Sequence, residues 1–154
     1  MYRRSVYTYW KRAAPMPDMQ AFDVPTREYC VVRRATTGTP LQALVLWNDP
    51  AFVEAARVLA ARTMGDSGDD AAKIGVMFRR CTGHVIEEKE RAVLVRLLTA
   101  NRARYSASGG AEDAAKMLMV GDSPVAEGVD KSELAAWTMV AGAVMNLYRV
   151  TTQE

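Results

Sequence analysis

The chain has 154 residues, of which 49% are apolar and 25% are charged, and its net charge is +2. These values are typical of one globular domain, long enough to bury roughly two thirds of the surface of its unfolded chain. They exclude a fibrous or low-complexity chain, since only 10 glycines and 6 prolines are present. The small net charge indicates neither an acidic nor a basic partner.

The first 38 residues lack helical periodicity, and prolines at positions 15, 17 and 25 interrupt them. β-prone residues at 6–10 and at 30–32 favour short strands, with one two-stranded ribbon as an open alternative. We therefore expect residues 1–38 to form an irregular, partly extended arm.

The same arm is basic and aromatic. It contains seven Arg and Lys residues against three acids, a net charge of +4, and six of the twelve aromatic residues. Such interleaving is compatible with binding of single-stranded nucleic acid or another anionic polymer. Functional basic surfaces usually carry a larger excess, so a nucleic-acid partner is disfavoured. We favour packing of arginine stems and aromatic rings onto a helical body.

Two helix starts follow the arm directly, at Thr39-Pro40 and at Asp49-Pro50. A short polar side chain can accept hydrogen bonds from the unpaired N–H groups of a first turn, and proline suits the first helical position. The two starts predict a short helix at 40–48 and a second helix that begins at Pro50.

The rest of the chain is predicted to be helical at about 50–64, 69–83, 87–105, 111–120 and 130–148. The last helix has no charged residue between Leu134 and Leu147, so we expect it at the centre. The predicted fold class is therefore mainly α, a bundle of about six helices in a single domain, 1–154, whose helical body is 39–154. The longest uncharged apolar stretch, 134–148, is too short to span a bilayer comfortably.

Several large side chains lie on the apolar faces of these helices. Trp47 and Trp137 are predicted core residues, as are Val93, Leu94 and Tyr105.

The sequence offers few groups for catalysis or metal binding. Cys81 and His84 form a C-x-x-H pattern, but a structural zinc site needs four ligands and Cys30 is the only other cysteine. A single disulfide between the two cysteines stays open. Segments 65–68 and 121–124 each contain Gly-Asp-Ser, yet neither completes a G-x-S-x-G nucleophile elbow. We predict no metal site, no cofactor and no catalytic residue, and an enzyme is disfavoured.

Three blocks of sequence together resemble one protein family. They are residues 3–12 (RRSVYTYWKR), residues 22–30 (FDVPTREYC) with Arg33-Arg34, and residues 39–44 (TPLQAL) with Asn48-Asp49-Pro50. Later pieces agree, namely Phe78-Arg79-Arg80, residues 134–137 (LAAW) and Asn146-Leu147. Over essentially the whole chain, the sequence resembles the C-terminal portion of the planctomycete-specific family of domains of unknown function, the PSD-one type.

The resemblance implies an extracytoplasmic setting, periplasmic or at the cell surface. Such domains usually lie at the C-terminal end of large exported proteins that also contain a cytochrome-c-like module. The chain itself carries no recognisable export signal. The resemblance also implies that Met1 lies inside a longer domain, so we expect a fragment or a short stand-alone version. Its partners would be other domains of the parent protein, or a second copy that covers apolar surface left open.

The family has no established catalytic residues, so none is carried over to this chain. Two positions depart from the family pattern: Gly38 stands where asparagine is frequent, and Tyr148-Arg149 where acids are common. These departures count against an intact polar site at those positions.

The function predicted from the sequence is a non-catalytic helical scaffold or interaction module of a larger exported protein. The alternative is a polar binding or enzymatic site, linked to polysaccharide breakdown or electron transfer and formed by Arg3, Arg4, Trp10, Asp23, Arg33, Arg34, Gln42, Asn48 and Asp49. We favour the first, in which these residues tie the arm to the first two helices through salt bridges and caps. Trp10, beside Lys11 and Arg12, is the aromatic residue that we most expect to be partly exposed, and tryptophan is enriched among binding hot spots.

Overall fold

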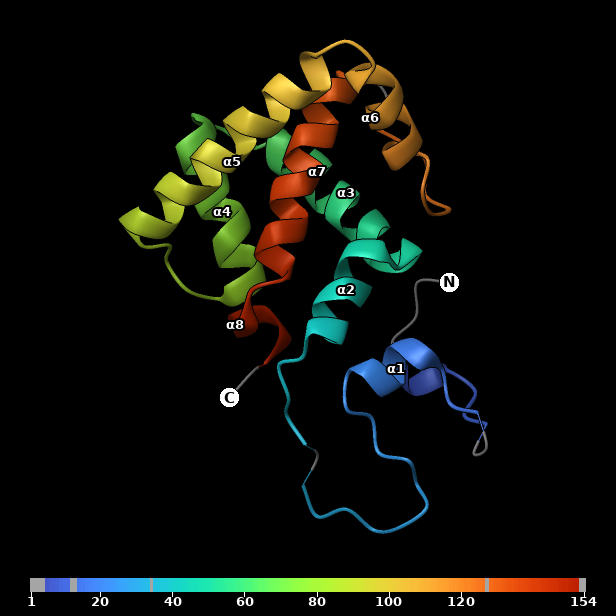
Figure 1. Ribbon diagram of the computed structural model, residues 1–154. Helices are drawn as coiled ribbons and strands as arrows, with labels where there is room; N and C mark the ends of the chain where they lie inside the picture. Colours follow the sequence, from blue (N-terminus) through green and yellow to red (C-terminus); the bar gives the residue numbers. More distant parts are fainter. Residues whose placement is uncertain (1–4, 12–13, 34, 127, 153–154) are drawn as a thin grey trace.

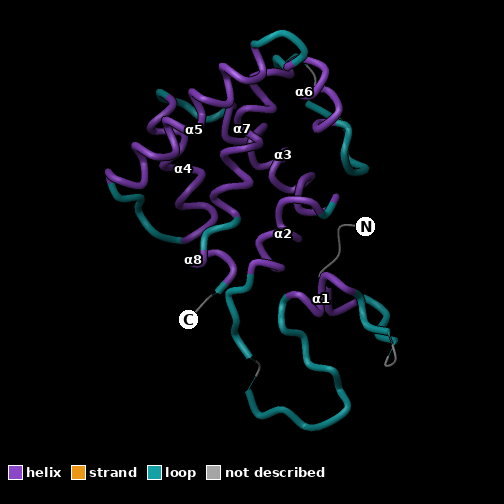
Figure 2. The backbone as a smooth tube through the Cα atoms, viewed as in Figure 1, coloured by secondary structure: helices purple, strands orange, loops and turns teal. Residues whose placement is uncertain are grey.

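The computed structural model describes residues 5–11, 14–33, 35–126 and 128–152. After a 3₁₀ turn at Ser5–Tyr7, the helices are α1 (Pro17–Ala21), α2 (Pro40–Asn48), α3 (Pro50–Met64), α4 (Asp70–Thr82), α5 (Glu88–Ser106), α6 (Gly110–Leu118), α7 (Lys131–Met145) and α8 (Tyr148–Thr151). The described ranges contain helices and loops but no strand (Figure 2). The predicted mainly α fold class is confirmed, and the two short helices α1 and α8 exceed the predicted number.

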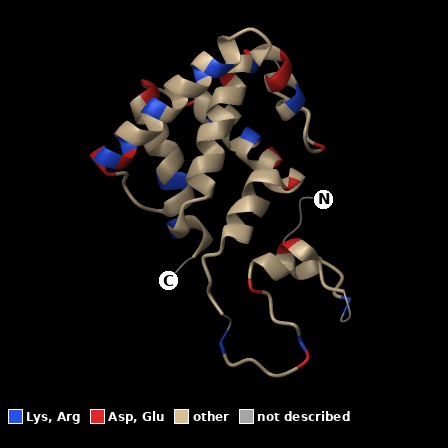
Figure 3. Ribbon diagram, viewed as in Figure 1, with Lys and Arg blue, Asp and Glu red and all other residues tan. Residues whose placement is uncertain are grey.

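Helix α7 is the centre of the helical body, as its uncharged sequence predicts. It packs against α3, α5 and α6, and these helices surround it in Figure 1. Figure 3 shows charged residues spread over α4, α5 and α6, whereas most of α7 carries none. Trp137 of α7 is buried and shares one core with Phe78, Leu98 and Leu118. The body is therefore organised by a helix that is uncharged from Leu134 to its end and buries most of that length.

Both predicted helix starts after the arm are present. The hydroxyl of Thr39 accepts a hydrogen bond from the Gln42 backbone N–H (3.3 Å), and Gln42 Oε1 accepts one from the Thr39 N–H (3.1 Å). This reciprocal pair is a capping box, which satisfies two N–H groups at the start of α2. Asp49 Oδ1 accepts from the Ala51 N–H (2.9 Å) and caps α3. Each helix thus begins at its own local cap, and α2 and α3 meet at a sharp corner at Asp49 (Figure 1).

The strands predicted in the arm are wrong. Residues 5–7 form a 3₁₀ turn instead, and residues 30–33 form a loop whose side chains are exposed. β-Propensity depends on a partner strand and on a face to bury, and the prolines between the two segments prevent a register that would supply either. The arm beside α2 is therefore irregular, and its loop residues 24–33 and 35–36 lie away from the body (Figures 1 and 2).

Two of the predicted core residues are wrong and three are confirmed. Trp137, Leu94 and Tyr105 are buried, but Val93 is 52% exposed and Trp47 is 39% exposed. Helix α5 buries only one narrow stripe, and Val93 lies beside it. Trp47 lies at the rim, over Gly142 of α7, where an added Cβ would come within 2.8 Å of its Cζ3.

Among the described residues, none of the helices combines the length and the apolar character needed to cross a bilayer.

Candidate functional site

The first polar cluster joins the arm to α2. Asp23 Oδ2 accepts hydrogen bonds from the Thr37 N–H (2.8 Å) and hydroxyl (2.7 Å), and from Gln42 Nε2 (3.4 Å). Gln42 Nε2 also donates to Thr37 Oγ1 (3.2 Å), and Gln42 is only 5% exposed. Asp23 has a φ of 56°, a left-handed conformation that aspartate tolerates better than most residues. The cluster therefore closes the arm loop at both ends and fastens it to α2.

A hollow of about 220 Å³ lies at this cluster, where the arm, α2 and α8 meet. Besides Asp23, Thr37 and Gln42, it is lined by Phe22, Ala35, Thr36, Thr151 and Thr152. Thr152 is buried, and its hydroxyl has no hydrogen-bond partner within the described residues. The hollow is thus small and polar.

Trp10 lies in a different hollow, between the arm and α3. The guanidinium of Arg27 stacks over its ring, 5.1 Å from the centroid. Beside it, the rings of Phe22 and Phe52 pack at 5.7 Å, which joins the arm to α3. The two halves of the predicted polar site therefore occupy separate places, with Asp23 and Gln42 in one and Trp10 in the other.

The remaining predicted site residues are dispersed. Asn48 Nδ2 donates to the Leu44 carbonyl of its own helix (2.8 Å), Asp49 caps α3, and Arg33 is exposed. Arg3, Arg4 and Arg34 lie outside the described residues.

Two charged residues that the sequence analysis missed are buried on α3. Glu54 and Arg57 are each 3% exposed. Glu54 accepts hydrogen bonds from the backbone N–H groups of Asp122 (2.8 Å) and Ser123 (3.2 Å), and Arg57 donates to the Ser123 carbonyl and hydroxyl (2.7 Å each) and to the Leu118 carbonyl. Together they clamp the loop after α6. One sequence signal could have indicated that Glu54 and Arg57 are buried: they lie three residues apart, about one helical turn, next to buried alanines of α3.

A third polar network joins three helices around Arg102 of α5. Its Nε donates to both carboxylate oxygens of Glu133 (3.0 and 2.9 Å), and its terminal nitrogens pair with Asp70 at the start of α4. Trp137 Nε1 also donates to Glu133 (2.7 Å). Hydrogen bonds from Arg102 hold the pKa of Asp70 and the pKa of Glu133 below their usual values, although partial burial opposes the shift. The network therefore favours charged carboxylates in the folded chain.

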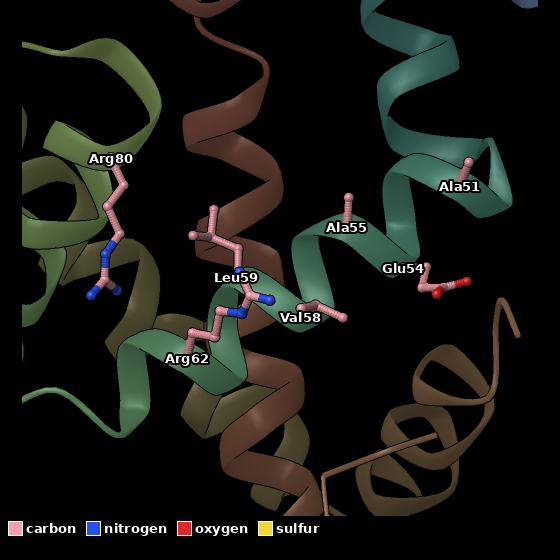
Figure 4. Close-up of a pocket in the computed structure, with 7 residues that line it drawn as sticks. All are labelled: Ala51, Glu54, Ala55, Val58, Leu59, Arg62 and Arg80. Atoms are coloured by element: carbon pink, nitrogen blue, oxygen red, sulfur yellow. The ribbon is translucent and has the colours of Figure 1, made fainter. Parts of the chain in front are cut away.

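A hollow of about 770 Å³ is a groove along α3 (Figure 4). Small apolar side chains line its length, among them Ala55, Val58 and Leu59. Figure 4 shows Glu54 towards one end, with Arg62 and Arg80 towards the other. Arg80 forms a two-point ion pair with Asp66 (2.6 and 2.8 Å), so its charge is already matched within the chain. This groove is a surface for apolar contact more than a site for chemistry.

The described residues contain no group of three His, Cys, Asp or Glu side chains placed to hold a metal ion. Cys30 is exposed and Cys81 is half-buried, and both are free thiols. Burial raises the pKa of the Cys81 thiol, which makes it a poor nucleophile at neutral pH.

A family model matches residues 1–98, which include the arm, helices α2 to α4 and half of α5. The chain belongs to the PSD1 family, described as protein of unknown function (DUF1553). The PSD1 match includes all three N-terminal blocks that carry the resemblance, and it contains both Asp23 and Gln42. No curated protein and no solved structure matches the chain.

Proposed function

We propose that this PSD1 chain is a non-catalytic helical scaffold or interaction module of a larger exported protein. The observation that carries the proposal is the use of its buried and half-buried polar side chains. Asp23 and Gln42 bond across 19 residues of sequence, and Arg57 reaches a loop 66 residues away. Arg102 bonds to partners 31 and 32 residues away. The hydrogen bonds of these side chains hold distant segments of the chain together, which is the role that a scaffold requires.

The exposed apolar surface supports a role in binding other domains. Leu41, Leu44 and Trp47 follow one another at three-residue spacing on α2, and all three are exposed. The apolar groove of α3 adds to this surface. Because contiguous apolar surface often marks a protein interface, the proposed partners are neighbouring domains of the parent protein, with a second copy of the chain as the alternative.

The proposed setting follows from the family resemblance. We place the chain in the C-terminal part of a longer planctomycete domain, outside the cytoplasm. The open reading frame upstream of Met1 tests both points, since continuous coding that begins with an export signal is expected. A stop codon directly upstream would contradict the longer parent.

The experiment that tests the scaffold role measures association. The chain and the neighbouring parent segment are produced as separate proteins, and their affinity is measured by sedimentation. We expect Leu41→Ser with Leu44→Ser to weaken association, whereas Val93→Ser, at an exposed apolar residue on α5, leaves it unchanged. No association, or equal affinity for both variants, contradicts this role.

The second candidate is a small polar binding site at the 220 Å³ hollow, favoured by the buried hydroxyl of Thr152 that has no partner in the described chain. Asp23→Ala, which removes a carboxylate that lines this hollow, separates the candidates. Loss of thermal stability in Asp23→Ala, with any ligand binding retained, supports the scaffold. Loss of ligand binding with thermal stability unchanged supports the polar site.

A further inference from the structure

The hollow around Trp10 has the walls of a binding site. Its volume is about 400 Å³, within the usual range for ligand sites. Apolar and aromatic side chains of the arm and of α3 form most of the lining: Val6, Trp10, Met19, Phe22, Val24 and Phe52. Such walls suit one large apolar side chain.

Two polar atoms of opposite kind belong to the residues that line this hollow. Trp10 Nε1 is a hydrogen-bond donor and Asp18 Oδ1 is an acceptor, and both are buried without a partner among the described residues. Buried polar atoms are normally paired, so two such atoms at one hollow require an explanation. A peptide group offers the complement, since its C=O accepts and its N–H donates.

Arg27 covers the hollow in a way that permits opening. Its guanidinium lies over the Trp10 ring, and its side chain is otherwise exposed. Its φ is 62°, a left-handed conformation that is unfavourable for arginine. Strain of this kind persists where the surroundings impose it and is frequent at ligand-binding positions. Displacement of the Arg27 side chain would uncover the Trp10 ring.

We infer that this hollow binds a short peptide segment of a partner chain through one apolar side chain and its adjoining peptide groups. The side chain packs against Phe22 and Phe52, its carbonyl accepts from Trp10 Nε1, and its N–H donates to Asp18 Oδ1, once Arg27 has moved aside. The carboxylate of Asp18 disfavours a phosphate-bearing ligand. The mostly apolar lining also disfavours a sugar. This inference rests on the proposed interaction module and names the chemistry of its partner.

The test uses the whole chain and N-acetyl-phenylalanine amide as the probe. The indole N–H resonance of Trp10, assigned with Trp10→Phe, is followed in ¹⁵N–¹H spectra during titration. We expect a saturable shift of this resonance at millimolar probe, while the resonance of the buried Trp137 stays in place. The absence of a saturable shift overturns the inference.

Two variants test the hydrogen bonds. Asp18→Asn keeps the shape of the hollow, and Trp10→Phe keeps an aromatic ring in its wall but removes the indole N–H. Each is expected to weaken binding about tenfold, or about 1.4 kcal/mol; for Trp10→Phe, the amide resonances near the hollow report binding. Glu28→Gln makes the same charge change on an exposed arm residue, and Tyr9→Phe removes a polar atom from an exposed ring. Both controls should bind as the unmodified chain does. Equal binding by all four variants overturns the inference.

Two further probes test the chemistry of the ligand. N-acetyl-alanine amide keeps the peptide groups without the large side chain, and benzyl alcohol keeps the ring without the peptide groups; both are expected to bind at least about fivefold more weakly. Equal binding by either one, or tighter binding of adenosine, overturns the inference. The outcome is separate from that of the proposed scaffold, which is read from the association that depends on Leu41 and Leu44.

Discussion

Gly121 approaches Glu54 so closely that a Cβ on the glycine would lie 2.1 Å from Oε2 of the carboxylate. Its φ of 93° lies in a region that side-chain-bearing residues rarely adopt. Because Glu54 accepts the two N–H groups that follow, those of Asp122 and Ser123, the loop can reach it only through a residue without a side chain.

Gly121→Ala is therefore expected to destabilise the chain by at least about 2 kcal/mol, from backbone strain together with the clash at Glu54. Chemical denaturation measures the effect. Gly83→Ala is the matched control, because Gly83 has a φ of 74° but no described atom lies within 4 Å of the Cβ that alanine would add there. It should cost about 1 kcal/mol from backbone strain alone. Equal losses in the two variants would show that the close approach contributes nothing.

Arg57→Met removes the guanidinium that bonds to Leu118 and Ser123. We expect a loss of about 3 kcal/mol, since the buried carbonyl groups lose their partner while the apolar volume is roughly kept. Arg62→Met, further along α3 and at the rim of its groove, should change stability by less than about 0.5 kcal/mol. A similar unfolding midpoint for both variants would contradict the clamp.

The Arg102 network predicts a loss of stability in acid. The pKa values of Asp70 and Glu133 are lowered in the folded chain, so their contribution is complete above their unfolded values of 3.8 and 4.5. It is lost as the pH falls through the folded pKa values, because protonation then breaks the pairing with Arg102. Arg102→Met should lower the melting temperature at pH 7 and flatten its dependence on pH below about 4.5. If the melting temperatures of the unmodified chain and of Arg102→Met depend on pH in the same way, the Arg102 network does not contribute to stability.

Gln42→Leu tests the fastening of the arm. The change keeps the size of the buried side chain but removes its hydrogen bonds to Asp23, Thr37 and Thr39, at a cost of about 2 kcal/mol. We also expect faster trypsin cleavage after Arg27 and Arg33, as the loop segment 24–33 loosens.

Asn48→Ala is the control for that experiment, because its amide bonds only within α2 among the described contacts. Its cleavage rate should match that of the unmodified chain. If Gln42→Leu also leaves cleavage unchanged, the hydrogen bonds of Gln42 do not hold the arm.

The helix boundaries near the arm could be predicted because their causes are local. Thr39 and Asp49 cap helices within three residues of themselves, and proline follows each. Gly83 ends α4 in a left-handed conformation at the expected place. The central position of α7 could also be predicted, since its long uncharged stretch from Leu134 to Met145 presents apolar side chains on every face.

The polar contacts that position the candidate sites were decided by tertiary structure. The hydrogen bonds of Asp23, Arg57 and Arg102 join residues between 14 and 66 positions apart. No local pattern encodes such pairs, because they depend on which faces meet after the helices pack. The burial of Glu54 shows the same limit: a glutamate on a helix indicates a solvated position until a loop from elsewhere presents two N–H groups to it. Sequence alone therefore determined helices α2 to α7 and the central place of α7, and the packing of distant segments determined where the charged side chains lie.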